Sequence, residues 1–165
     1  MIKILITGNG AGKTTCAIGK AIRFIGNKQS VYFRSFFKTP TSESSTLMGL
    51  EQCYPKLLNY QTCGVYGYEN KNEQFKAGAL ELTNVCLLKD YNVIILDELT
   101  YMLEYLKWDK EYITKFINNL QCDCLIITGR NCPRWFVKIF DTVSEIKKMK
   151  HIYDETKEAH EGIDF

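Results

Sequence analysis

A glycine-rich turn between a short apolar run and an amphipathic segment constrains this chain most. The run Ile2–Thr7 is followed directly by Gly8-Asn9-Gly10-Ala11-Gly12-Lys13-Thr14-Thr15. Glycines at alternate positions let backbone N–H groups turn toward an anion, and the positive end of the following helix points to the same place. Lys13 would then reach the outer phosphates, and Thr14 would offer its hydroxyl to Mg²⁺. The sequence therefore predicts a phosphate-binding loop for a nucleoside triphosphate.

The loop departs at one position from the common pattern G-x-x-x-x-G-K-[ST]. That pattern places the first glycine where this chain has Thr7, and Gly8 comes one residue later. A plain glycine turn that only joins a strand to a helix is the alternative. The Gly-Lys-Thr-Thr ending, the strand before it and the amphipathic segment after it favour phosphate binding.

The length predicts one domain spanning residues 1–165. The hydrophobic content of 45% and charged content of 24% are typical of a soluble globular protein. A net charge of +2 gives no reason to expect a nucleic-acid partner. The amino terminus lacks the apolar core of a signal peptide and no run is long enough for a membrane span, so we expect a cytoplasmic protein without a membrane partner.

Seven cysteines form an odd set without a C-x-x-C pair. This spacing argues against a disulfide framework and against a zinc site, and we expect most of them to be small core residues. Cys122 and Cys124 could act together, but in a strand their side chains simply point to the same face. His151 and His160 are the two histidines, and the basic run before His151 is typical of a solvated surface.

Strand-like and helix-like segments alternate along the chain. Helical spacing joins Ala17, Ile18, Ala21, Ile22 and Ile25 before Gly26, and then the apolar residues of 72–89 (Phe75, Ala79, Leu82, Cys86). A third helix has Asp109 as its N-cap and Tyr112, Ile113, Phe116, Ile117 and Leu120 on one face. We expect residues 40–45 to form a surface loop. The predicted strands are Ile2–Thr7, Ser30–Phe37, Leu57–Cys63, Val93–Asp97, Leu125–Thr128 and Thr142–Ile146.

This alternation predicts a mostly parallel sheet with helices on both faces, the α/β arrangement of P-loop nucleotide-binding proteins. Ligands of such folds bind at the carboxyl ends of the strands. Asp97 and Glu98 follow four apolar residues there, and one of these carboxylates would join Thr14 as an oxygen ligand of Mg²⁺. The residues alone leave open whether Glu98 is a metal ligand or a general base.

Three further strand ends carry candidate ligand contacts. Arg130 and Lys38 could bind phosphate or could be solvated, with nothing in the residues to decide. Tyr66 and Tyr68 flank a glycine and could wall a flat ligand, although local packing is the more ordinary interpretation.

These motifs resemble those of one family, the ATP:corrinoid adenosyltransferases built on a RecA-like P-loop fold. The family's T-G-N-G-x-G-K-T-T loop, with the same shifted glycine, is similar to Thr7–Thr15. The carboxyl-terminal tail, residues 141–165, is similar to the family's carboxyl end at the same spacing. It is the most discriminating match, because generic phosphate-loop proteins have nothing like it. The other similar stretches are Gly19–Gly26, Phe36–Lys38, Leu96–Met102, Ile127–Arg130, Asp141–Glu145, Lys150-His151 and Gly162–Phe165.

The resemblance implies that Co(I) of a reduced corrinoid attacks the 5′ carbon of ATP and expels triphosphate with Mg²⁺ (or Mn²⁺) present. It implies that Lys13, Thr14 and Glu98 are catalytic and that the metal ligands are Thr14, Asp97 and Glu98. Residues 8–15, Lys38 and Arg130 would bind ATP. Tyr66 and Tyr68 would contact the corrinoid in place of the family's Phe and Trp, and Glu43 would match a family glutamate.

The resemblance further implies a homodimer and a flavoprotein reductant. Two other functions stay open at this point. One is a small P-loop kinase or ATPase, which the missing arginine-rich lid and the tail disfavour. The other is a corrinoid- and ATP-binding module with weakened catalysis, which the tyrosine substitutions suggest.

Overall fold

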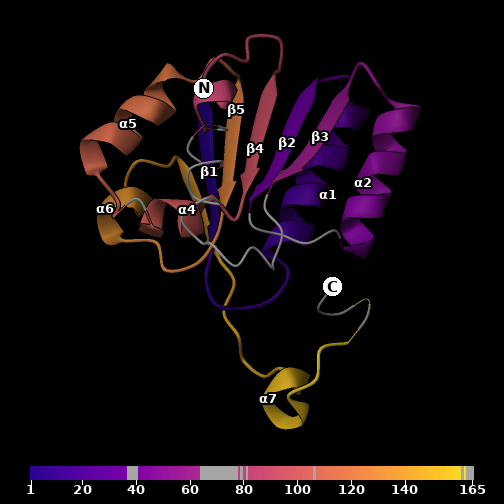
Figure 1. The fold of residues 1–165 in the computed structure, drawn as a ribbon, viewed down its shortest axis with the longest axis vertical. Coiled ribbons are helices and arrows are strands. Elements are labelled where there is room, and N and C mark those ends of the chain that lie inside the picture. Colours follow the sequence, from indigo (N-terminus) through magenta and orange to yellow (C-terminus); the bar gives the residue numbers. More distant parts are fainter. Residues whose placement is uncertain are drawn as a thin grey trace.

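Six parallel strands form one sheet in the computed structural model, which describes residues 1–36, 41–63, 78, 80, 82–105, 107–160 and 162. The strand order is β3-β2-β4-β5-β1-β6 (Figure 1). The strands are β1 (Ile2–Thr7), β2 (Val31–Phe36), β3 (Leu58–Cys63), β4 (Val93–Asp97), β5 (Cys124–Thr128) and β6 (Thr142–Glu145). Each predicted strand is confirmed to within one residue at either end, except that Phe37 lies outside the described residues.

Helices cover both faces of the sheet (Figure 1), which confirms the predicted α/β fold. Alternate residues of β4 belong to different cores: Ile94 and Leu96 pack with α4, α5 and α6, whereas Val93 and Ile95 pack with α1 and α2. Such continuous apolar strands are typical of parallel sheets buried on both sides. The helices are α1 (Lys13–Gly26), α2 (Ser42–Cys53), α4 (Leu99–Tyr105), α5 (Lys110–Asn119), α6 (Arg134–Val137) and α7 (Ile152–Thr156).

Helix α1 follows the predicted phosphate loop and buries a narrow stripe. Ala17, Ala21 and Ile25 are buried at a spacing of four residues. The prediction that Ile22 shares this face is wrong, since its side chain is 52% exposed. At 3.6 residues per turn, position 22 lies well away from the line through 17, 21 and 25.

Helix α2 corrects the surface loop predicted for residues 40–45, of which residue 40 lies outside the described residues. Thr41 caps the helix in a capping box with Ser44, and the Tyr60 hydroxyl from β3 donates to Ser44 Oγ at 2.9 Å. Leu47 is the buried apolar anchor. Serine and threonine have poor helix propensity, so the capping box and the packing on β3 form this helix in spite of its composition.

Helix α5 begins as predicted at Asp109, whose side chain accepts a hydrogen bond of 2.8 Å from the Tyr112 N–H. Ile113, Phe116 and Ile117 are buried, as expected. Tyr112 is 49% exposed, so its predicted place on the buried face is wrong. Among the described residues, no helix has the length and apolar character needed to cross a bilayer.

Candidate active site

The phosphate loop leaves the carboxyl end of β1 and leads directly into α1. Gly12 is the N-cap of α1, with a φ of +95°. Among the described residues, no N-cap side chain accepts a hydrogen bond from the first N–H groups of this helix. The first N–H groups of a helix have no intrahelical partners and carry its positive end, so they favour an anion. Lys13 is only 4% exposed, and its ammonium donates to the Gly10 carbonyl at 2.7 Å. The loop therefore offers a positive charge and backbone donors in one place.

Asp97 brings the end of β4 to the same loop. Its carboxylate is fully buried and accepts a hydrogen bond from the Thr14 hydroxyl at 3.1 and 3.2 Å to its two oxygens. A hydroxyl and a carboxylate in contact are oxygen donors of the kind that a hard divalent cation prefers. The structure thus brings together two of the residues expected to hold Mg²⁺, Thr14 and Asp97.

Glu98 turns the chain sharply after the strand. Its φ is +58°, in the left-handed region that non-glycine residues seldom adopt, and it is partly buried. Its charge also acts on a neighbouring thiol. Burial raises the pKa of Cys132, the hydrogen bond from Thr7 lowers it, and the Glu98 carboxylate raises it further. Cys132 bonds to Thr7 at the end of β1, so the charge of Glu98 acts on a group beside the start of the phosphate loop.

Thr128 is a positioning residue whose role the sequence did not predict. Its hydroxyl donates to Asp97 Oδ1 at 2.6 Å and accepts from the Glu98 N–H at 2.9 Å. One side chain thus holds both acidic residues in their orientation. The strand order accounts for this role. Strand β5 lies beside β4, so Thr128 at the end of β5 meets Asp97 at the end of β4.

Thr128→Val removes both hydrogen bonds while keeping the shape of the side chain. We expect the free energy of unfolding to fall by about 1–3 kcal/mol, because the buried Asp97 carboxylate loses a hydrogen bond of 2.6 Å. Nucleotide affinity should fall as well, since the acidic pair loses its orientation. Thermal unfolding and ATP titration measure the two effects. Thr128→Ser keeps the hydroxyl and should restore most of both; a serine variant as weak as the valine variant would contradict the assignment.

Gly129 and Arg130 extend the site from the end of β5. Gly129 has a φ of +149°, and a Cβ there would lie 1.8 Å from Thr100 Oγ1, so glycine lets helix α4 approach the strand end. Arg130 is exposed, and its guanidinium donates to the Asn9 carbonyl at 2.9 Å. Arg130, which was predicted to bind ATP, thus contacts the phosphate loop directly.

The segment after β6 explains the shifted first glycine. Ile146 donates its N–H to the Thr7 carbonyl and accepts the Gly10 N–H, both at 2.8 Å. A Cβ on Gly8, whose φ is +109°, would lie 2.2 Å from the Ile146 carbonyl oxygen. Position 8 must therefore be glycine because the tail passes directly against it.

The far side of the loop contacts helix α2. The Thr15 hydroxyl donates to Glu43 Oε1 at 2.7 Å. Glu43, expected from the resemblance alone, thus contacts the first turn of α1 from the first turn of α2. Lys38, Tyr66 and Tyr68 lie outside the described residues, so the described part of the site is its phosphate and acidic side.

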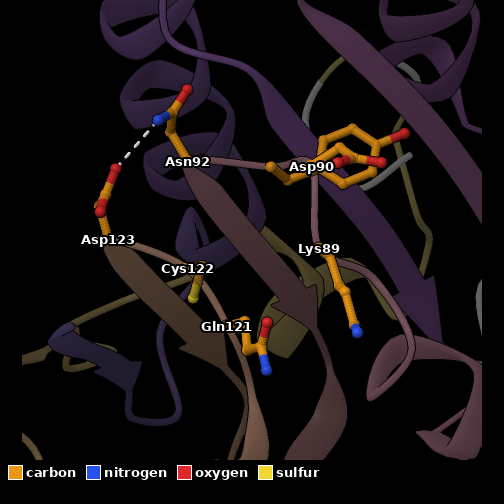
Figure 2. A pocket seen from close by; sticks show the side chains of 7 residues that line it. Lys89, Asp90, Asn92, Gln121, Cys122 and Asp123 are labelled. Carbon is orange, nitrogen blue, oxygen red and sulfur yellow. Dashed lines mark hydrogen bonds between the residues drawn. The ribbon is translucent and has the colours of Figure 1, made fainter.

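A separate pocket of about 420 Å³ opens at the opposite end of the strands from the phosphate loop, beside the amino ends of β4 and β5 (Figure 2). Lys89, Asp90 and Cys122 are among its lining residues, and the Asn92 amide donates to Asp123 at 2.9 Å on its rim. Burial is the main cause that raises the pKa of the Cys122 thiol to about 11. Ligands of open α/β sheets bind at the carboxyl ends of the strands, so this pocket is distinct from the phosphate site.

A likeness in fold alone links the chain to a solved structure. The flagellar accessory protein FlaH from Methanocaldococcus jannaschii matches with a TM-score of 0.52 at 17% sequence identity. The match covers 84% of this chain and 65% of that one.

Sequence comparison identifies much nearer relatives. The corrinoid adenosyltransferase of Escherichia coli K12 is 31% identical, and the corrinoid adenosyltransferase CobA of Salmonella typhimurium is 33% identical. Each match covers 99% of this chain and 85% of the relative. The family model described as "ATP:corrinoid adenosyltransferase BtuR/CobO/CobP" matches residues 1–165. The chain therefore belongs to the ATP:corrinoid adenosyltransferase family.

Proposed function

We propose that this chain transfers the 5′-deoxyadenosyl group of ATP to the cobalt of a reduced Co(I) corrinoid and releases triphosphate. Two electrons of Co(I) form the bond to the 5′ carbon, the carbon–oxygen bond breaks, and the triphosphate leaves with that electron pair. The cobalt ends as Co(III). The observation that carries the proposal is the phosphate loop in contact with Asp97 through Thr14, within a chain of this family.

Residues 8–15 hold the triphosphate as a leaving group. Negative charge grows on the oxygen that departs from the 5′ carbon, and groups already in place for that charge lower the barrier. Lys13 and the amino end of α1 supply positive charge beside the loop. Arg130 adds a further positive charge beside the loop through its hydrogen bond to Asn9. Lys38 is proposed as another ATP contact from the resemblance.

Thr14, Asp97 and Glu98 are proposed to hold Mg²⁺ or Mn²⁺. The fit rests on the donor set: one hydroxyl already in contact with a buried carboxylate, and a second carboxylate on the next residue. When bound, the cation neutralises part of the triphosphate charge. The attacking group is cobalt, so the reaction has no attacking water that Glu98 could deprotonate. We therefore assign Glu98 as a metal ligand.

The corrinoid side of the proposal comes from the resemblance. Tyr66 and Tyr68 would contact the corrinoid. Residues 1–165 would act as a single catalytic domain in a cytoplasmic homodimer, with a flavoprotein as the source of electrons and without a nucleic-acid partner.

An anaerobic assay tests this function. Chemically reduced cobalamin and Mg-ATP are mixed with the protein, and the Co(I) absorbance is followed. We expect the Co(I) bands to be replaced by those of adenosylcobalamin, only when enzyme and ATP are both present. Consumption of ATP without corrinoid would indicate a kinase or ATPase, and tight corrinoid binding without turnover would indicate a module that has lost catalysis.

A further inference from the structure

The segment after β6 meets the phosphate loop through three hydrogen bonds. Ile146 bonds to Thr7 and Gly10 through its backbone, both at 2.8 Å. Two residues later, the Lys148 N–H donates to Asn9 Oδ1 at 2.9 Å. The tail thus runs along the loop over residues 7–10 instead of touching it at one point.

Asn9 is held from a second direction as well. Its carbonyl accepts the Arg130 guanidinium at 2.9 Å, while its side-chain oxygen is taken by Lys148. Both oxygens of Asn9 therefore point to protein groups, one from the end of β5 and one from the tail. Neither acts as a free acceptor facing the place where phosphate would lie.

We propose that Asn9, Arg130, Ile146 and Lys148 form a loop clamp that fixes the phosphate loop in its anion-binding shape before the nucleotide arrives. They are positioning residues that set the affinity for the triphosphate group. The Gly10 N–H is bonded to Ile146, so within residues 8–15 the clamp leaves direct phosphate binding to the N–H groups at the start of α1 and to Lys13, while residues 8–10 shape the loop. A loop already held in shape loses less freedom on binding, which raises affinity. This inference rests on the proposed function and deepens it.

The clamp uses the backbone of Lys148 and leaves its charge for another contact. The Lys148 ammonium pairs with Asp154 of α7 at 2.8 Å. Any residue except proline has the N–H that Asn9 accepts, because proline has no backbone N–H. Lys148→Ala and Lys148→Pro therefore separate the charge of this residue from its hydrogen bond to the loop.

The experiment measures binding of inorganic triphosphate and of Mg-ATP by calorimetry, with the full chain and without corrinoid. We expect Asn9→Ala and Lys148→Pro each to weaken triphosphate binding about tenfold, the change expected for losing one hydrogen bond. Lys148→Ala keeps the N–H that Asn9 accepts and should weaken binding less than Lys148→Pro. The double variant Asn9→Ala/Lys148→Pro should be no weaker than either single variant, because both changes remove the same bond.

Thermal unfolding of each unliganded variant shows whether the fold is kept, and Asn9→Ala, on an exposed side chain, serves if Lys148→Pro does not fold. Unchanged binding by Asn9→Ala, or losses that multiply in the double variant, would overturn the clamp. So would Lys148→Ala weakening binding as much as Lys148→Pro, which would place the effect in the charge. Wild-type protein that binds triphosphate but makes no adenosylcobalamin would refute the proposed function and leave the clamp standing.

Discussion

Lys13→Ala should lower kcat/KM for adenosyl transfer on the order of 10²–10³-fold, the range found when a preorganised electrostatic donor is removed from an active site. Its ammonium is almost fully buried over the phosphate loop. A leaving triphosphate needs that charge more in the transition state than in the bound substrate, so kcat should fall more than ATP affinity. Initial rates at saturating Co(I) cobalamin and varied ATP separate the two.

Lys20→Ala is the matched control, because Lys20 lies on the same helix and is more exposed. It should leave the rate unchanged. Unfolding temperature should change little in either variant, since Lys13 contributes to the loop and not to the apolar core. A Lys13→Ala enzyme with the wild-type rate would mean that another group carries the leaving triphosphate.

Gly8→Ala should destabilise the protein by roughly 3 kcal/mol or more, the sum of a positive-φ penalty and a contact with backbone that cannot rotate away. The added Cβ would lie 2.2 Å from the Ile146 carbonyl oxygen. In a chain of this length, each kcal/mol lowers the unfolding temperature by about 2–4 °C. Differential scanning calorimetry measures the shift, and ATP titration should show that the loop no longer binds.

Two glycines separate the causes of this effect. Gly12 has a φ of +95° but open space around its Cβ position, so Gly12→Ala should show the conformational penalty alone. Gly19 lies in α1 with open space and a negative φ, so Gly19→Ala should be neutral or slightly stabilising. If Gly8→Ala were no less stable than Gly12→Ala, the contact with Ile146 would not explain the shifted glycine.

The centre of the sheet was predictable because its strands are rich in apolar, β-branched residues. Val93–Leu96 is a continuous apolar run, Ile2–Ile6 is apolar except for Lys3, and the loop between β1 and α1 follows from its glycines. Helix α2 was missed because its sequence is rich in serine, and its stability comes from the Thr41 capping box and from packing on β3. Local sequence patterns contain neither of these as a periodic signal.

The site was predictable where its residues adjoin a motif and was missed where it depends on strand order. Thr14 and Asp97 were expected as partners because both belong to motifs of phosphate-loop proteins. Thr128 and Ile146 act through the neighbours that the sheet gives them, β4 for one and β1 for the other. The strand order β4-β5-β1-β6 brings Thr128 and Ile146 to their partners. This order cannot be deduced from the sequence of any single segment.

The inorganic product of a single anaerobic turnover tests the central claim most directly. Enzyme in excess over ATP labelled at the γ-phosphate, with Mg²⁺ and Co(I) cobalamin, is quenched and its phosphates are separated. We predict that the label appears in intact triphosphate, in one-to-one amount with adenosylcobalamin, because the bond to the 5′ carbon is the one that breaks. Label in free phosphate, or ADP as the remaining nucleotide, would contradict the account, since it would show that the loop presents a terminal phosphate for transfer.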